Sequence, residues 1–159
     1  MKKIPRDLNR IDRHIIRILQ DYGRITYADL ARQVGLTTTP CIERVKRLEK
    51  EGFIRGYSAQ IEPEFLNAGL IIFVQIKLDR TSKDSFDNFR SAVVHLEQVQ
   101  ECHLVSGNFD YLIKARVADM VAYREFLGET LLSVPGVLES TSKVVMETVK
   151  ESLKIEVSY

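Results

Sequence analysis

The sequence predicts an α+β chain of two domains, and three observations lead to that prediction. Apolar residues in the first 52 positions recur at three- and four-residue steps, which is typical of amphipathic helices. Residues 70–159 instead alternate strand-like and helix-like segments in the order βαββαβ, which is the ferredoxin-like plan. Charge divides the chain in the same way, because residues 1–60 hold 13 Lys/Arg and 7 Asp/Glu while residues 61–159 hold 10 and 15. We therefore expect domains over 1–52 and 70–159, joined by a linker strand or hinge over 53–69.

Three helices account for the amino-terminal domain. The first ends near residues 22–24 and carries an apolar stripe made of Leu8, Ile11, Ile15, Ile18 and Leu19. A short second helix begins after Thr26 as N-cap and ends at Gly35, which supplies the left-handed conformation that a tight turn requires. The third is capped by Thr37 or Thr39 and runs to residue 51. Two helices joined by a short turn containing glycine form a helix-turn-helix, which we expect to be of the winged type.

The third helix is predicted to have a buried side and a cationic side. At about 100° per residue, Cys41, Val45 and Leu48 share one side. The opposite side is polar and consists of Thr39, Glu43, Lys46, Arg47 and Lys50, flanked by Arg44. Cations bind phosphates, and Arg and Thr reach base edges, so this side suits a DNA duplex. The alternative is a solvated face with Glu–Lys pairs; the preceding turn and the net charge of +6 over residues 1–60 favour DNA binding.

Enzymes, metal proteins and membrane proteins are disfavoured. None of the motifs GxGxxG, GxxxxGK[ST], GxSxG or HExxH occurs, and Cys102 and His103 are neighbours on a predicted strand, so their side chains point to opposite faces. Cys41 is expected to be a small packed thiol. We expect no catalytic residue, no metal and no cofactor. The longest apolar stretch, 68–74, falls far short of the roughly 20 residues of a membrane helix, and residues 1–12 contain no secretory signal, which predicts a cytoplasmic protein.

The segment between the domains is too apolar for a free linker. Residues 53–61 partly alternate and predict a strand, which we expect to pair with another segment, such as its copy in a second chain. Glu62-Pro63 then breaks the pattern.

The carboxy-terminal domain is expected to contain four strands and two helices. The strands are predicted over 70–78, 99–105, 109–117 and 137–149, and the helices over 85–96 and 120–132. Gly107-Asn108 is expected to make a hairpin turn. In this plan both helices cover one face of the sheet, which leaves the other face to water or to another subunit. Because a helical domain of about 60 residues is marginal alone, we also expect oligomers.

A small-molecule site is one interpretation of the second hairpin. Gly107 leaves room for a ligand to approach backbone N–H groups, and Asp110 suits an ammonium group. An apolar wall is predicted from Leu104, Met120, Val144 and Val145. Together these groups match the needs of a free amino acid. The alternative is that Gly107 is only a turn and Asp110 its hydrogen-bond acceptor, and spacing alone favours this alternative.

Several motifs together resemble the Lrp/AsnC family over nearly the whole chain. They are Leu8-Asn9-Arg10-Ile11-Asp12, Gly23-Arg24-Ile25, Val34-Gly35-Leu36, Thr39-Pro40-Cys41, residues 44–49, residues 101–112 and residues 131–137.

The resemblance implies a transcription regulator that binds double-stranded DNA as a homodimer, with dimers assembling to an octamer or larger. It implies a small amino-acid effector, such as leucine or alanine, bound between dimers at Leu104, Gly107, Asp110, Met120, Val144 and Val145. For DNA, we expect Thr38 and Thr39 to position the third helix, and contacts from Arg44, Lys46, Arg47 and Lys50. Two alternatives remain open: an architectural, nucleoid-type DNA-binding protein with little sequence preference, and a metabolic binding protein or enzyme whose front domain only packs.

Overall fold

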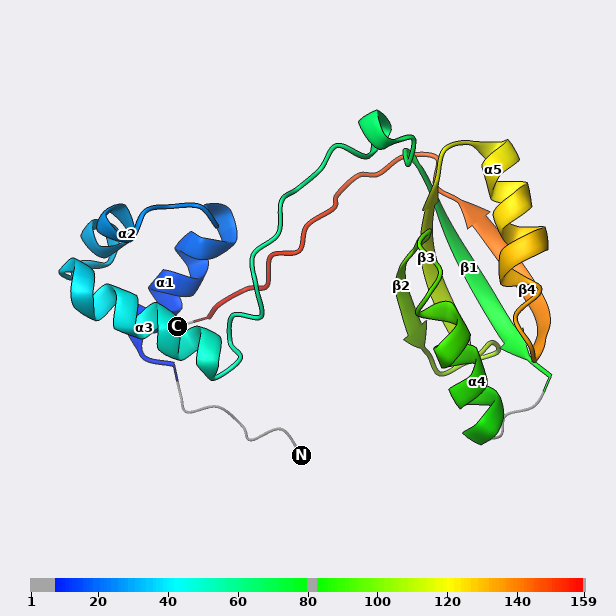
Figure 1. Cartoon of the computed structure of the whole chain (residues 1–159), viewed down its shortest axis with the longest axis horizontal. Helices are drawn as coiled ribbons and strands as arrows, with labels where there is room; N and C mark the ends of the chain where they lie inside the picture. The colour runs from blue at the N-terminus through cyan, green and yellow to red at the C-terminus, as the bar shows by residue number, and fades with distance from the viewer. Residues whose placement is uncertain (1–7, 80–82, 159) are drawn as a thin grey trace. The chain divides into compact units, whose positions relative to one another are not determined.

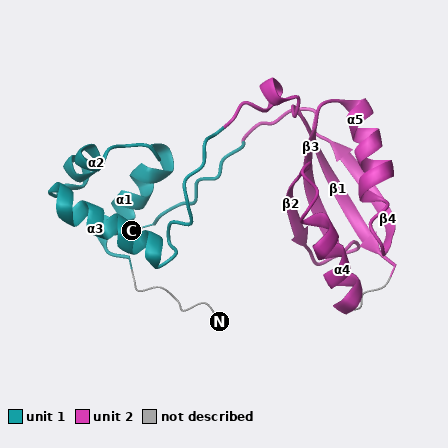
Figure 2. Cartoon of the chain, in the orientation of Figure 1, with its two compact units in different colours: residues 1–60, 151–159 teal, residues 61–150 magenta. Residues whose placement is uncertain are grey.

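The computed structural model describes residues 8–79 and 83–158 and divides the chain into two compact units (Figures 1 and 2). The first unit comprises residues 1–60 and 151–159, and the second comprises residues 61–150. The expectation about a secretory signal rests on residues 1–12, of which residues 1–7 lie outside the described part.

Three helices form the first unit: α1 (Arg10–Asp21), α2 (Tyr27–Val34) and α3 (Thr38–Lys50). The predicted ends of α2 are confirmed, because the Asp29 backbone N–H donates to Thr26 Oγ1 at 3.1 Å and Gly35 is left-handed with φ of 70°. Thr37 is the N-cap residue of α3, although its side chain makes no capping hydrogen bond. The helix-turn-helix prediction is therefore confirmed, with α3 ending one residue earlier than expected.

A small apolar core holds α3 against the other two helices. Cys41, Val45 and Leu48 are all buried, as the helical spacing predicts, and pack with Ile15 of α1 and Leu30 of α2. Burial raises the pKa of the Cys41 thiol, so this cysteine is a packed apolar residue. The core fixes which side of α3 faces outward.

The carboxy-terminal tail belongs to this helical unit (Figure 2). The side-chain amide of Gln20 in α1 makes two hydrogen bonds with the backbone of Ile155. Its Nε2 donates to the Ile155 carbonyl at 3.0 Å, and its Oε1 accepts from the Ile155 N–H at 2.7 Å. Arg17 donates to the carbonyl of Val157, and Lys154 pairs with Asp21. Residues 154–157 therefore lie along α1.

The strand predicted over residues 53–61 is absent from the single chain. Residues 55–62 form neither a helix nor a strand, and residues 63–66 form the short 3₁₀ helix η1 (Pro63–Leu66). A strand needs a partner for its backbone groups, and no described segment of the chain pairs with this one. Pairing with a second chain remains a prediction.

One antiparallel sheet organises the second unit. Its strands are β1 (Leu70–Leu78), β2 (Val99–Leu104), β3 (Tyr111–Val117) and β4 (Val137–Val144), in the spatial order β2-β3-β1-β4 (Figure 1). With α4 (Lys83–Val93) and α5 (Met120–Glu125), the order of elements is βαββαβ. The ferredoxin-like prediction is confirmed.

Both helices cover the same face of this sheet (Figure 1). Burial alternates along β3, where Tyr111, Ile113, Ala115 and Val117 pack beneath the helices. The opposite face carries no helix within residues 61–79 and 83–150, and its half-buried side chains include Phe73 and Leu112. The alternation sorts apolar residues to the helix side because successive strand residues point to opposite faces.

Several element ends differ from the prediction, by up to three residues in α4, β2 and β3 and by five residues in β4. β4 stops at Val144, which pairs with Ile72 of β1, and residues 145–149 are not part of it, although the Val145 N–H still donates to the Ile71 carbonyl. The last helix continues beyond α5 as the π-helix η2 (Phe126–Leu131), in which Leu132 N–H bonds the carbonyl five residues earlier.

Candidate nucleic-acid interface and effector residues

The exposed side of α3 contains the residues expected to meet DNA. Thr38 and Thr39 lie in its first turn and are exposed, as are Lys46, Arg47 and Lys50, whereas Arg44 is half-buried. All six therefore belong to one helix, and the buried residues 41, 45 and 48 determine their direction. A helix anchored on one side with cations on the other fits the major groove, whose width admits one helix.

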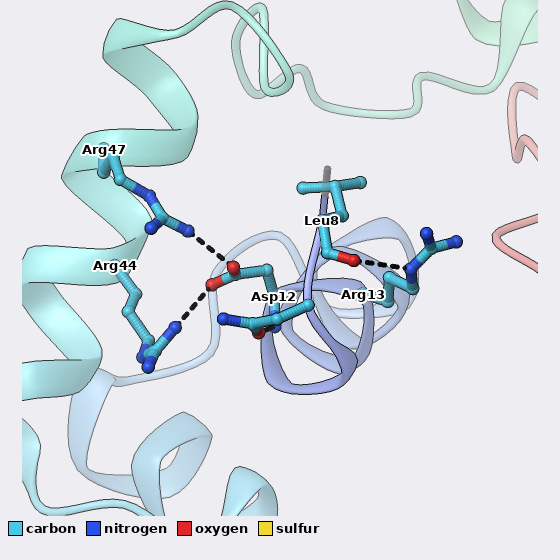
Figure 3. Close-up of polar contacts among 6 residues, drawn as sticks. Leu8, Asp12, Arg13, Arg44 and Arg47 are labelled. Carbon is cyan, nitrogen blue, oxygen red and sulfur yellow. Dashed lines mark hydrogen bonds and ion pairs between the residues drawn. The ribbon is translucent and has the colours of Figure 1, made fainter. Parts of the chain in front are cut away.

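Two of these cations are bound by a residue that the helical spacing did not single out. The Asp12 carboxylate of α1 accepts from Arg44 Nη1 at 3.0 Å and from Arg47 Nη2 at 2.5 Å (Figure 3). The Asp12 side chain is 1% exposed, whereas those of Arg44 and Arg47 are 29% and 45% exposed. Each guanidinium therefore has a fixed anionic partner on its inner side and solvent on its outer side.

A sequence signal for Asp12 exists but is easily overlooked. Asp12 lies four residues after Leu8 and three before Ile15, so it falls within the apolar stripe of α1 and not on its polar side. A carboxylate within an apolar stripe must have a partner when the helix packs, because an unpaired buried charge is strongly destabilising.

An open depression separates the start of α1 from α3. It is lined by Asn9, Pro40, Glu43, Arg44 and Arg47. Asn9 is the N-cap of α1 and accepts from the Asp12 backbone N–H at 2.9 Å. The two arginines thus border a concave surface beside the exposed side of α3.

The residues expected to bind an effector form two groups at opposite ends of the sheet. Leu104 pairs with Tyr111, so Leu104, Gly107 and Asp110 lie at one end. Val117 pairs with Leu70 at the other end, where Met120, Val144 and Val145 lie. The length of β3, six residue steps, separates the groups by roughly 20 Å. One chain therefore does not bring all six residues together, and the predicted apolar wall is not continuous within it.

The geometry of the loop of residues 105–110 is compatible both with an amino-acid site and with a plain turn that Asp110 stabilises. Gly107 has φ of 140°, a conformation that residues with a Cβ rarely adopt, and it borders open space. The Asp110 carboxylate accepts from the Leu78 backbone N–H at 2.8 Å, and its own backbone N–H donates to the Ile76 carbonyl at 2.8 Å. Asp110 is thus a loop-stabilising acceptor that stays partly exposed, so a role toward a ligand has to be tested separately.

Histidine, cysteine and acidic side chains are the residue types that most often hold metals or act in catalysis. No group of three His, Cys, Asp or Glu side chains within residues 8–79 and 83–158 is arranged to hold a metal ion. His103 Nε2 lies 3.1 Å from Glu101 Oε2 on the exposed sheet face, and this hydrogen bond lowers the pKa of Glu101. Burial raises the pKa of the Cys102 thiol. Among the described helices, none combines the length and the apolar character needed to cross a bilayer.

Comparisons with known proteins agree with this two-unit arrangement. Residues 8–55 match a winged helix-turn-helix DNA-binding model, and residues 71–155 match the Lrp/AsnC ligand binding domain. The leucine-responsive regulatory protein of Escherichia coli K12 is 56% identical over 155 residues, which are 97% of this chain and 94% of that protein. The corresponding protein of Klebsiella pneumoniae has the same identity and coverage.

Solved structures are similar over the same span. A transcriptional regulator of Neisseria meningitidis, solved as a complex with L-Met, matches with a TM-score of 0.90 and 35% identity, over 94% of this chain and 97% of that one. A feast or famine regulatory protein of M. tuberculosis, complexed with L-methionine, matches with a TM-score of 0.87 and 32% identity, over 96% and 100% of the two chains.

Proposed function

The chain belongs to the Lrp/AsnC family and is a DNA-binding transcriptional regulator, not an enzyme, and from that premise we propose which residues read DNA and which bind the effector. The observation that carries the proposal is the anchored position of α3, whose cations and hydroxyl groups lie opposite its buried side.

The six predicted α3 residues act as the DNA-reading set in this proposal. The first turn, with Thr38 and Thr39, enters the major groove, where the start of a recognition helix meets base edges. Lys46 and Lys50 are exposed and suit phosphate contacts, while Arg47 and Arg44 offer planar guanidinium groups for base edges or phosphates. The set combines positioning contacts with sequence-reading contacts.

A homodimer supplies the second reading helix. Two copies of α3 spaced by about one helical turn of DNA would bind a roughly palindromic site. The helix-free sheet face, with Phe73 and Leu112 among charged neighbours, supports burial against a second subunit. We propose that dimers assemble further, to an octamer or larger, so that DNA can wrap around the particle.

The effector is proposed to be a small amino acid, such as leucine or alanine, bound where two subunits meet. The group Leu104, Gly107 and Asp110 of one subunit would face Met120, Val144 and Val145 of another, because a single chain separates them. Relatives solved with L-methionine support an amino-acid ligand. Binding across the contact would favour one assembly by its differential affinity, typically about 1–3 kcal/mol.

Arg47→Ala tests the DNA-reading set. We expect binding to an operator duplex, selected from a random library, to weaken by about 1–3 kcal/mol, or roughly 5- to 150-fold, with the assembly mass unchanged. Fluorescence anisotropy measures the affinity, and light scattering measures the mass of the assembly. A thermal melt measures how much the fold is destabilised when Asp12 loses Arg47 as one of its two partners.

The matched control is Arg32→Ala, which removes the same charge from an exposed surface pair on α2. Equal loss on scrambled duplexes would make Arg47 a phosphate contact. Failure of the unmodified protein to prefer any sequence would favour the architectural alternative.

A further inference from the structure

Asp12 is the one buried charged side chain that the structure shows among residues 8–79 and 83–158. It occupies the third position of α1, where its backbone N–H donates to the N-cap side chain of Asn9 at 2.9 Å. Its carboxylate therefore lies near the positive end of the α1 dipole, and two guanidinium groups complete its surroundings. The burial and these contacts hold the Asp12 carboxylate in place between α1 and α3.

The contacts of Asp12 restrain both arginines before any DNA is present. One N–H of each guanidinium points to Asp12, at 3.0 Å for Arg44 and 2.5 Å for Arg47 (Figure 3). A guanidinium has five N–H donors in a fixed fork, so each arginine keeps further donors for an outside partner. Since part of each side chain is exposed, those donors reach the surface of the depression beside α3.

We propose that Asp12 is a positioning residue for DNA recognition: it holds Arg44 and Arg47 in the orientation in which they meet the duplex. The proposal rests on the DNA-reading set proposed above. Two consequences follow. Side chains ordered in advance lose less entropy on binding, and the anion reduces the local charge of two cations to a net of +1, which limits attraction to DNA of any sequence.

A purely structural role, in which Asp12 only joins α1 to α3, makes a different prediction. Loss of such a clamp lowers the folded fraction, and this weakens binding to every duplex by the same factor. Loss of positioning instead changes the ratio between operator and random DNA. The ratio is therefore the quantity to measure.

Asp12→Asn in the full-length protein removes the charge while nearly preserving shape. We expect operator binding to weaken about tenfold at fixed salt, while binding to a scrambled duplex stays equal or tightens and its salt dependence steepens, because the local charge rises. The control Asp29→Asn removes the same charge from the exposed Asp29–Arg32 pair of α2 and should keep the wild-type ratio. A wild-type ratio in Asp12→Asn, or an equal fall of the ratio in Asp29→Asn, would overturn the proposal.

A measurement on the unmodified protein keeps the test valid if Asp12→Asn does not fold. The Nε–H order parameters of Arg44 and Arg47, measured by NMR without DNA, should approach the value of about 0.85 found for rigid backbone. Arg32, whose side chain is 78% exposed, serves as the mobile reference. Values below about 0.6 for both arginines would refute positioning. If the unmodified protein binds no operator more tightly than scrambled DNA, the DNA-reading proposal fails. If the unmodified protein does prefer an operator and Asp12→Asn shows the same preference, only the proposed role of Asp12 fails.

Discussion

Asp110→Asn separates the two roles that Asp110 can have. The carboxylate accepts from the Leu78 backbone N–H at 2.8 Å, and an asparagine oxygen can accept the same hydrogen bond. The substitution therefore preserves the acceptor that holds the loop of residues 105–110 and removes only the negative charge. Asp110→Ala, in contrast, would remove both and would confuse loop stability with ligand binding.

The magnitude follows from the proposed ammonium contact. A hydrogen bond to a charged group contributes about 1.5–3 kcal/mol, so loss of the charge should weaken amino-acid binding roughly 10- to 150-fold. Because the loop keeps its acceptor, the thermal midpoint of unfolding should change little. Operator binding without effector should also persist, since α3 belongs to the other unit.

Calorimetric titration with leucine, alanine and methionine measures the first effect, and an operator titration with and without each amino acid measures the second. Asp87→Asn is the matched control, because it removes the same charge from an exposed pair with Arg90 in the same unit. Unchanged effector affinity in Asp110→Asn would show that Asp110 only stabilises the loop, and the ammonium assignment would then be refuted.

Two further predictions concern stability and pH. Leu48→Ala, at a fully buried position in the core of the helical unit, should lower the free energy of unfolding of that unit by about 2–5 kcal/mol in a denaturant titration, whereas Leu66→Ala at an exposed position should have little effect. His103→Ala should raise the pKa of Glu101 back toward its ordinary value of 4.5 in an NMR titration, because the His103 hydrogen bond is the largest cause that lowers it. Since the pKa of Glu101 is lowered by folding, the contact stabilises the fold above the ordinary pKa and loses this effect as the pH falls through the lowered value; an unchanged titration midpoint would contradict the assignment.

Local patterns predicted most of the fold because they have local causes. Thr26 and Gly35 bound α2 through capping chemistry that needs only neighbouring residues, and the alternation from Tyr111 to Val117 needs only one covered face. The strand predicted over residues 53–61 does not form within the single chain, and its pairing with a second chain stays a prediction, since strand formation depends on a distant partner that no local pattern reveals. β4 also ended earlier than predicted, close to the point where its antiparallel partner β1 begins.

The candidate sites were predictable as residue types and not as arrangements. Helical spacing assigned Lys46 and Lys50 to the outside of α3, which depends on α3 alone. Asp12 binds Arg44 and Arg47, which follow it by 32 and 35 residues in the sequence. Helical periodicity describes one segment at a time and cannot predict contacts between two helices. The separation of Asp110 from Met120 likewise depends on strand register, which a list of spaced residues does not specify.

The docking of residues 154–157 on α1 makes the helical unit discontinuous in sequence, and this affects its maturation during translation. Helices α1 to α3 are synthesised before the 90 residues from 61 to 150. At 5–20 residues per second, that interval lasts about 5–18 s. During it, the α1 surface around Gln20 lacks the cover that residues 154–157 provide. We therefore expect the helical unit, although its helices are made first, to be completed only after the second unit has been synthesised.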